Sequence, residues 1–407
     1  MILRRQSWRA PQWYGLAARY LAADKAVVDA WRSINHARLM DTFIGLVHIN
    51  SPSFFEQEIA VWLTERLIDL GLSVENQKYD KSINLIGRKA GTVRGAPTII
   101  LSSHMDTVEP TRGLIPMREG GIIRTDGSTI LGADDKSGIA EILETLHVLK
   151  EQDLPHGGIE VVFTSAEERG LIGAGALDFD SLQGRIALVL DCSGSIGRVV
   201  LAAPTHDIYT MRITGRAAHA GIEPERGTSA IKAAAKIIAA VPDGRIDQNT
   251  TANIGIIQGG TATNIVPKEV TITGEIRSHD AGALEKTKKT IFDTARRLSK
   301  KNQVKIEIEE NRQYNGFHIS ESDEFVGLIK TVCEDLSITP EFIVYGGGSD
   351  ANIFNSHGIK SLVISSGMQM PHTTEEYIKE EDLSTAVLML LGTLKALAAG
   401  VTSLPFA

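Results

Sequence analysis

The chain is poor in cysteine, in long apolar runs and in excess positive charge. Only two cysteines, Cys192 and Cys333, occur in 407 residues, which excludes a disulfide framework and a cysteine-based zinc finger. No stretch approaches the ~20 apolar residues that a membrane-spanning helix needs. The formal net charge of −8 argues against a nucleic-acid protein held by phosphate contacts. We therefore expect a cytoplasmic protein that binds neither nucleic acid nor membrane.

The composition is that of a globular protein, and the length suggests two to three domains. Hydrophobic residues make up 43% and charged residues 23% of the chain. Residues 1–35 stand apart, because four arginines precede the first acid, Asp24. Such a segment is either an acid-poor targeting sequence or an extension with little packing, which includes the case of a misplaced start codon. We favour the extension.

Most of the chain alternates short apolar runs with amphipathic segments. Helical periodicity begins near residue 36 and recurs at 55–70 and 136–150, where apolar residues form one stripe. Four apolar runs have the pattern of strands buried on both faces: 98–103, 159–165, 186–191 and 361–366. Strands that alternate with helices predict an α/β fold with a mixed, partly parallel sheet.

The middle of the chain follows a different plan. The expected elements are a strand at 208–215, a helix at 226–241, strands at 252–258 and 269–277, a helix at 281–301 and a strand at 304–310. That order is the ferredoxin-like βαββαβ plan. We therefore predict a discontinuous catalytic domain, residues 36–206 and 314–407, with an inserted domain at 207–313.

Acids and a histidine follow three of the expected buried strands. The first strand ends in His104 and Asp106, the second in Glu167 and Glu168, and the third in Asp191. Ligands of open α/β sheets bind beyond the carboxyl ends of the strands. Buried acids are costly unless something compensates them, and a divalent cation such as zinc, manganese or cobalt suits this mixture of ligands.

Two further segments can add ligands to that edge. Asp134 and Asp135 stand just before the helix at 136–150, and His372 precedes Thr373 and Thr374. Helix capping is the simpler interpretation of both segments. Two adjacent acids nevertheless leave one carboxylate for another task.

Taken together, these motifs resemble the metal site of the M20 metallopeptidase family. They are His104-x-Asp106, Gly-Ala-Asp134-Asp135-Lys136-x-Gly, Glu167-Glu168, Asp191 and His372, and their order and spacing are similar to the peptidase T (tripeptide aminopeptidase) branch. The likeness covers about residues 37–397. It implies a mixed-sheet metallopeptidase domain with an inserted lid and dimerisation domain, and a homodimer formed through that insert.

The resemblance also implies roles for the matching residues. The ligands of two divalent ions, most simply zinc with manganese or cobalt as alternatives, would be His104, Asp134, Glu168, Asp191 and His372. Asp134 would bridge the ions, and the Asp134–Asp135 peptide bond is often cis in the family. Glu167 would be the general base for a metal-bound hydroxide, and Asp106 would orient the imidazole of His104.

The expected insert carries a second set of residues that match the family. His219, in Gly-Arg-Ala-Ala-His-Ala-Gly, would polarise the scissile carbonyl, and in dimeric relatives it comes from the partner subunit. Asn264 and Arg277 occupy substrate-contact positions, and Arg277 would bind a substrate carboxylate, although a lone strand arginine is often a surface residue. Gly347 and Ser349 lie in a glycine-rich turn that would contact substrate. A nucleotide P-loop is excluded there because no Gly-Lys-Ser/Thr follows.

The sequence therefore predicts a two-metal hydrolase of short peptides. We favour an aminopeptidase that acts on tripeptides. An N-acyl amino-acid amidohydrolase or a carboxypeptidase with the same metal site is the alternative, because all of them cleave an amide near a charged end. A metal-binding scaffold that has lost catalysis would have lost the base or a ligand. Glu167 and all five ligand positions are present.

Overall fold

The computed structural model describes residues 32–400 and divides them into two compact units. Unit 1 extends to Val200 and includes Ser320–Ile343 and the chain from Ser349 onward, whereas unit 2 comprises Leu201–Ile319 and Val344–Gly348. The chain thus leaves unit 1, forms unit 2 and returns. The expected extension at 1–35 lies almost entirely outside the described residues.

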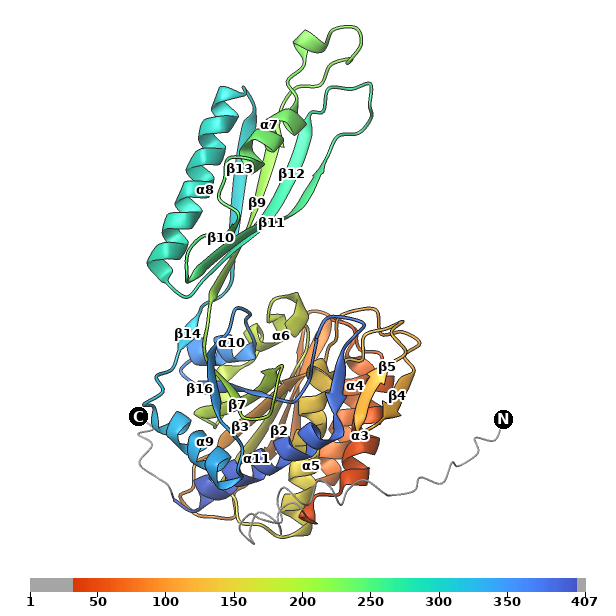
Figure 1. The fold of residues 1–407 in the computed structure, drawn as a ribbon, viewed down its shortest axis with the longest axis vertical. Coiled ribbons are helices and arrows are strands. Elements are labelled where there is room, and N and C mark those ends of the chain that lie inside the picture. The colour runs from red at the N-terminus through yellow and green to blue at the C-terminus, as the bar shows by residue number, and fades with distance from the viewer. Residues whose placement is uncertain (1–31, 401–407) are drawn as a thin grey trace, which may run out of the picture. The chain divides into compact units, whose positions relative to one another are not determined.

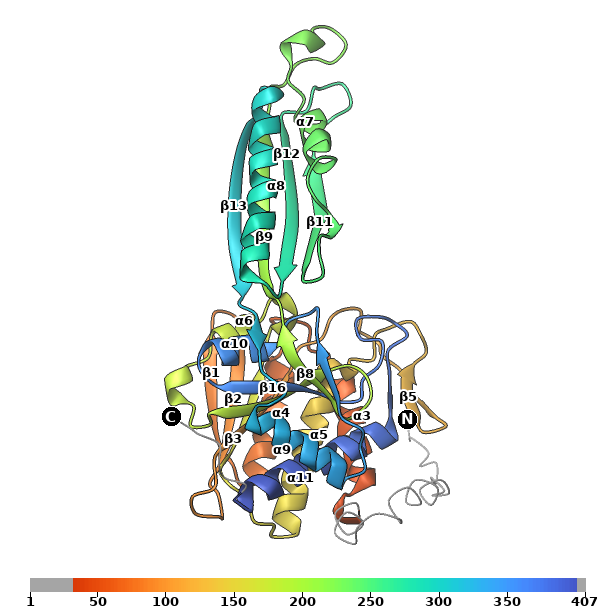
Figure 2. The same ribbon diagram turned by 60° about the vertical axis from the view of Figure 1, so that its left-hand side comes forward.

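Unit 1 is built on a mixed sheet (Figures 1 and 2). The strands of this sheet follow the order β1 (Ser73–Tyr79), β2 (Ser82–Lys89), β6 (Ile159–Thr164), β3 (Ile99–His104), β7 (Ile186–Cys192), β16 (Lys360–Ser365) and β8 (Arg198–Ala203), with β14 (Phe317–His318) and β15 (Glu341–Val344) also paired to β8. The second half of β8 and all of β14 belong to the residues assigned to unit 2. The central pairs β6–β3, β3–β7 and β7–β16 are parallel, and the outer pairs β1–β2, β2–β6 and β16–β8 are antiparallel. All residues of β3 and β6 are buried, as their apolar runs predict.

Helices pack against this sheet through their apolar stripes. They are α3 (His36–His48), α4 (Gln57–Asp69), α5 (Ala133–Glu151), α6 (Ile172–Gly175), α9 (Glu324–Asp335), α10 (Asp350–Ser356) and α11 (Glu380–Ala398). The long helix α5 contacts α3, α11 and β3, and nearly all of its residues are buried. The helices expected near residue 36 and at 55–70 and 136–150 correspond to α3, α4 and α5.

A small antiparallel sheet changes one expectation about the segment after His372. Its strands are β17 (Tyr377–Lys379), β5 (Ile122–Thr125) and β4 (Pro116–Glu119). Thr373 and Thr374 do not precede a helix directly, because Tyr377 pairs with Arg124 in β5 and α11 begins only at Glu380. Helix capping therefore does not explain this segment.

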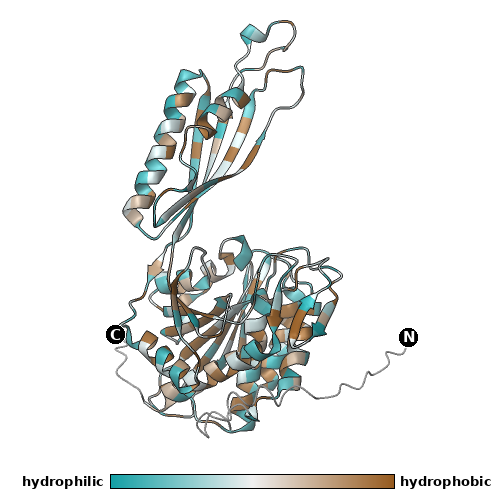
Figure 3. Ribbon diagram, viewed as in Figure 1, coloured by the Kyte–Doolittle hydropathy of each residue, from teal (hydrophilic) through white to brown (hydrophobic). Residues whose placement is uncertain are grey.

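Unit 2 has the predicted ferredoxin-like plan. Its elements are β9 (Thr205–Thr214), α7 (Ala230–Ile238), β10 (Gly244–Arg245), β11 (Thr250–Gly259), β12 (Glu269–Ser278), α8 (Ala281–Lys301) and β13 (Lys305–Tyr314), and the sheet order is β10-β11-β12-β9-β13. Both helices cover one face, where alternate strand residues form the core (Figure 3). Helix α7 is shorter than the expected 226–241 because Ser229 caps it, its side chain accepting from Lys232 N. Together the two units confirm the predicted fold class.

Within residues 32–400, none of the helices is both long enough and apolar enough to cross a membrane.

Candidate metal centre

The expected ligands that follow β3, β6 and β7 meet at one edge of the sheet in unit 1. His104 is the last residue of β3, Glu167 and Glu168 lie in a single 3-10 turn just after β6, and Asp191 is near the end of β7. Because β6, β3 and β7 are parallel neighbours, their carboxyl ends lie side by side. The sheet topology thus assembles residues that are far apart in the sequence.

The start of α5 adds Asp134 to this edge. The Asp134–Asp135 peptide bond is cis, as the family resemblance implies. Asp135 is turned toward β3, where Ser103 Oγ donates to its Oδ2 at 2.6 Å and His104 N donates to the same oxygen at 3.2 Å. Asp134 faces the other way, and its Oδ1 lies 3.0 Å from His104 Nε2. One acid of the pair is therefore structural, and the other is available as a ligand.

His372 approaches the same acids from the loop before β17. Its Nε2 lies 2.9 Å from Glu168 Oε1 and 3.2 Å from Asp134 Oδ2. The side chain is 52% exposed, whereas the acids that it faces are largely buried. His372 therefore closes the cluster on its solvent side.

Among residues 32–400, potential ligand atoms form three groups in which all atoms lie within 4.8 Å of one another. The groups are His104, Asp134 and Asp191, then His104, Glu167 and Glu168, and finally Asp134, Glu168 and His372. Each pair of groups shares one residue, which is His104, Asp134 or Glu168, and Asp134 joins the two groups that together contain all five expected ligands. Imidazole nitrogen with carboxylate oxygen is a donor set that suits zinc and its neighbours in the periodic table.

The buried acids of the cluster favour a bound cation. Burial, together with repulsion from neighbouring acids, raises the pKa of Glu167 and of Asp191 well above the usual range. Burial would also raise the pKa of Asp134, but hydrogen bonds from His104 and His372 lower it instead. So many buried acids are stable as anions only if positive charge lies among them. The residues present thus fit divalent ions.

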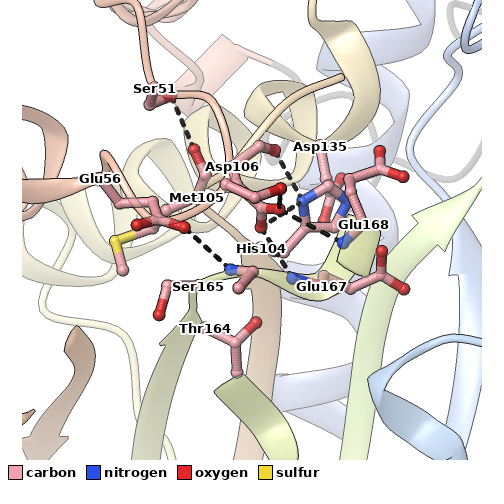
Figure 4. Close-up of polar contacts among 12 residues, drawn as sticks. Ser51, Glu56, His104, Met105, Asp106, Asp135, Thr164, Ser165, Glu167 and Glu168 are labelled. Atoms are coloured by element: carbon pink, nitrogen blue, oxygen red, sulfur yellow. Dashed lines mark hydrogen bonds and ion pairs between the residues drawn. The ribbon is translucent and has the colours of Figure 1, made fainter. Parts of the chain in front are cut away.

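Asp106 lies beside His104, where it was expected to orient the imidazole, and it has further partners. The Nδ1 atom of His104 is 2.8 Å from the backbone carbonyl of Asp106 and 3.5 Å from its carboxylate. The carboxylate accepts from the backbone N–H groups of Glu167 and Glu168 at 3.0 and 3.2 Å (Figure 4). It also accepts from Ser53 Oγ at 2.7 Å. Both the backbone carbonyl and the carboxylate of Asp106 face the imidazole, and the carboxylate also holds the turn that carries the two glutamates.

Two buried glutamates that the sequence analysis did not single out support this centre. Glu56 accepts from Ala166 N, at the start of the glutamate turn, and from Ser82 Oγ (Figure 4). Glu376 accepts from Gly132 N at 2.6 Å and from Asp134 N at 2.9 Å, and burial raises its pKa to about 7. Glu376 lies four residues after His372. The capping interpretation of that segment gives Glu376 no role in the site. The local sequence around Glu56 contains no comparable signal.

The residues expected to contact substrate fall in separate places. In unit 2, His219 and Asn264 lie in adjacent exposed loops, where His219 bridges to Ile265 and Ala220 N donates to Asn264 O at 2.9 Å. Arg277 lies eight residues beyond Glu269, where β12 begins, which is about 27 Å along an antiparallel strand. Unit 2 therefore brings His219 and Asn264 together but holds Arg277 at the other end of its sheet.

The glycine-rich turn leads from β15 into α10. Ser349 is the N-cap residue of α10 and is buried. The next residue, Asp350, accepts from Thr164 Oγ1 at the end of β6, which ties this turn to the sheet of unit 1. Gly347 lies in the same turn, two residues before Ser349, and belongs to the segment Val344–Gly348 of unit 2.

Comparisons with known proteins define the class of the chain. The model described as "Peptidase dimerisation domain" of the M20 peptidases matches residues 208–303, and the model described as "Peptidase family M28" matches residues 84–255. Peptidase T of Ligilactobacillus salivarius is 30% identical over 68% of this chain and 67% of its own length. The uncharacterized protein YqjE of Bacillus subtilis is 40% identical over 89% of this chain and 99% of its own.

Two solved structures agree with these matches. Aminopeptidase PepT from Bacillus cereus is 40% identical, with a TM-score of 0.82 over 90% of this chain and 100% of that one. A tripeptidase from Staphylococcus aureus is 38% identical, with a TM-score of 0.85 over 90% and 99%. Fold and matches together define a hydrolytic peptidase. The chain belongs to the M20 family of peptidases, in its peptidase T-like branch.

Proposed function

We propose that this peptidase is a two-metal aminopeptidase that removes the N-terminal residue from tripeptides. The observation that carries the proposal is that two of the three ligand groups, joined by Asp134, together contain all five expected ligands and leave out Glu167. A carboxylate shared in this way is what a pair of divalent ions requires. The tripeptide preference is supported by the names of the similar proteins, a tripeptidase and an aminopeptidase PepT.

One ion would be held by His104, Asp134 and Asp191, and the other by Asp134, Glu168 and His372. Zinc suits this set, and manganese or cobalt shares its chemistry. When bound, such a pair acts as a Lewis acid and lowers the pKa of water. A solved M20 peptidase of the same fold, the YXEP protein of Bacillus subtilis, is described as dinuclear metal binding.

Glu167 is the proposed general base. It lies in the turn that Asp106 and Glu56 hold rigid, and it is 9% exposed. Its carboxylate would take a proton from the attacking water and pass it to the nitrogen of the leaving peptide. Since Glu167 also lies in a ligand group with His104 and Glu168, its role as a base rather than a ligand needs a direct test.

The residues proposed to bind the substrate belong to unit 2, except Ser349 of unit 1, and a homodimer would complete the enzyme. We assign His219 to the scissile carbonyl, Arg277 to the substrate carboxylate, and Asn264, Gly347 and Ser349 to further substrate contacts. Two copies would associate through unit 2, where Ile256 and Ile257 on β11 are each 52% exposed. Beyond Ala252, no strand among the described residues pairs with the outer edge of β11. An unpaired edge with apolar side chains suits a second copy.

A substrate panel tests the proposed function. The metal-reconstituted enzyme would be assayed with a tripeptide, its N-acetyl form, its C-terminal amide, a dipeptide and an N-acyl amino acid. An aminopeptidase cleaves the free tripeptide and loses activity when the amine is acetylated. Preference for the N-acyl amino acid would instead identify an amidohydrolase, and loss of activity on the amide alone would indicate a carboxypeptidase.

Glu167→Ala tests the assignment of the base. We expect metal content close to wild type and a fall in kcat of about two to four orders of magnitude. Glu168→Ala is the matched comparison from the same turn, and it should lose metal. If Glu167→Ala loses metal as well, Glu167 is a ligand and the assignment is wrong.

A further inference from the structure

Arg277 lies in a row of polar residues on the face of the unit 2 sheet that carries no helix. It is paired in register with His206 of β9, and His206 is also paired with Tyr314 of β13. Alternate residues of β12, such as Ile272 and Ile276, turn to the other face and join the core beneath the helices. Arg277 and Glu275 therefore share the helix-free face.

Glu275 holds one edge of the Arg277 guanidinium. Arg277 Nε donates to Glu275 Oε1 at 3.1 Å, and Nη2 donates to Oε2 at 3.2 Å. On the opposite side, Nη1 donates to the hydroxyl of Tyr314 at 3.4 Å. The Tyr314 ring is itself confined, because a Cβ atom added at Gly348 would lie 2.3 Å from it. The guanidinium is thus oriented from two sides.

The ion pair is present at any pH at which the enzyme would work. Glu275 Oε2 lies 3.0 Å from Nε2 of the buried His206. Contact with His206, aided by Arg277, lowers the pKa of Glu275 to about 2 against the opposing effect of partial burial. Glu275 therefore remains an anion, and Arg277 remains paired with it.

The geometry leaves one end of the guanidinium for a ligand. Of its five N–H donors, Glu275 takes two and Tyr314 takes one, so one remains on Nη1 and one on Nη2. Two parallel N–H groups at that end match the two oxygens of a carboxylate. Arginine carries about 2 kcal/mol of side-chain entropy, and fixing it in advance makes this binding stronger.

We propose that Glu275 is a positioning residue that presents the Nη1–Nη2 end of Arg277 to the carboxylate of the substrate. This inference rests on the proposed function of Arg277 as the group that binds that carboxylate. Glu275 would contact no substrate atom itself. It would determine how strongly the enzyme prefers peptides with a free C-terminus.

Steady-state kinetics of Glu275→Gln, with a tripeptide and its C-terminal amide, test the proposal. Glutamine keeps the shape of the side chain but offers one acceptor oxygen and no charge. We expect KM for the free tripeptide to rise about tenfold, with kcat within about twofold of wild type. KM for the amide should stay near the wild-type value, because that substrate lacks the group that Arg277 binds. Glu275→Asp, which restores the charge, should recover part of the loss.

Glu309→Gln is the matched control. It removes the carboxylate from the exposed Arg212–Glu309 ion pair on the same face of the same sheet, and it should behave as wild type. An unchanged KM in Glu275→Gln would overturn the proposal. So would a lower KM, since Glu275 would then compete with the substrate. An equal rise in KM for tripeptide and amide would show a merely structural role.

Arg277→Ala separates this inference from the function on which it rests. If Arg277→Ala leaves the preference for free tripeptide over amide unchanged, the role of Arg277 is wrong. If it abolishes that preference while Glu275→Gln has no effect, only the role of Glu275 is wrong. In the double variant, Glu275→Gln should add nothing to the effect of Arg277→Ala.

Discussion

Asp106→Asn is the substitution that most directly tests how the glutamate turn is built. The buried carboxylate accepts three hydrogen bonds, with Glu167 N on Oδ1 and with Ser53 Oγ and Glu168 N on Oδ2. Asparagine has the same shape but only one acceptor oxygen. Ser53 can reverse its hydroxyl and accept from the new amide, but one backbone N–H of the turn loses its acceptor in either orientation.

The size of the effect follows from these bonds. A hydrogen bond to a charged group contributes about 1.5–3 kcal/mol, and a buried N–H without a partner costs a further 1–3 kcal/mol. Part of this is recovered when the turn shifts, so we expect a loss of about 2–4 kcal/mol. In a protein of 407 residues that lowers the Tm by roughly 2–5 °C. The shifted turn should also misplace Glu167 and reduce kcat by at least about tenfold.

Metal content makes this prediction specific. The backbone carbonyl of Asp106, which holds His104, is unchanged by the substitution. The ion at His104, Asp134 and Asp191 should therefore be retained, while affinity for the ion at Glu168 falls by about ten- to a hundredfold. Titration with zinc, followed by elemental analysis, should show one tight and one weakened site, whereas Asp191→Asn should weaken the other. Wild-type Tm, metal content and kcat would together refute the reasoning, and a higher Tm would show that repulsion from Glu56 outweighs the hydrogen bonds.

Four further predictions follow from other parts of the structure. Gly132→Ala should lower the Tm by a few degrees, because φ is +75° and the new Cβ would lie 3.1 Å from Thr107. The control is Gly127→Ala, which has a similar φ but no described atom within 4 Å of the Cβ, so its Tm change measures the cost of the backbone conformation alone. Burial raises the pKa of Asp382 to about 6, above the ~3.9 of an unfolded chain, so the contribution of this group to stability should fall as the pH rises from 4 to 6. Asp382→Asn should remove that loss and melt higher than wild type at pH 8 but not at pH 4, and equal Tm differences at both values would contradict this. A chelator should abolish turnover and lower the Tm by several degrees, with both restored by zinc; an unchanged Tm would mean that the acid cluster is stable without ions. Ile257→Glu should convert a dimer into a monomer on size-exclusion chromatography, and a persistent dimer would place the interface elsewhere.

The sequence predicted the sheet, the insert and the identity of the clustered acids because each depends on a local pattern. The fully apolar runs that became β3, β6 and β7 indicate strands buried on both faces, and parallel strands place the residues that follow them at one edge. The alternating pattern of β9 and the amphipathic α8 likewise fixed the ferredoxin-like order.

The supporting contacts could not be predicted because they join residues distant in the sequence. The contact of Asp106 with His104 follows from their spacing, but its bonds to the backbone of Glu167 and Glu168 cross about sixty residues of sequence. Glu56 reaches Ala166 across more than a hundred residues of sequence. Glu275 and Arg277, by contrast, are two residues apart on a predicted strand, so their position on one face could be predicted, whereas the contact of Glu275 with His206 of β9 could not.

The way in which the chain enters and leaves unit 2 has a consequence for folding. The entry strand β9 and the exit strand β13 are hydrogen-bonded neighbours, and His206 near the start of one is paired with Tyr314 at the end of the other. An unstructured segment of on the order of 100 residues would oppose closure of unit 1 by about 4 kcal/mol of chain entropy. Once unit 2 has folded, its two ends are already adjacent and that penalty is gone. The folded insert would then hold the two segments of the catalytic unit close together, and its early folding would speed their assembly.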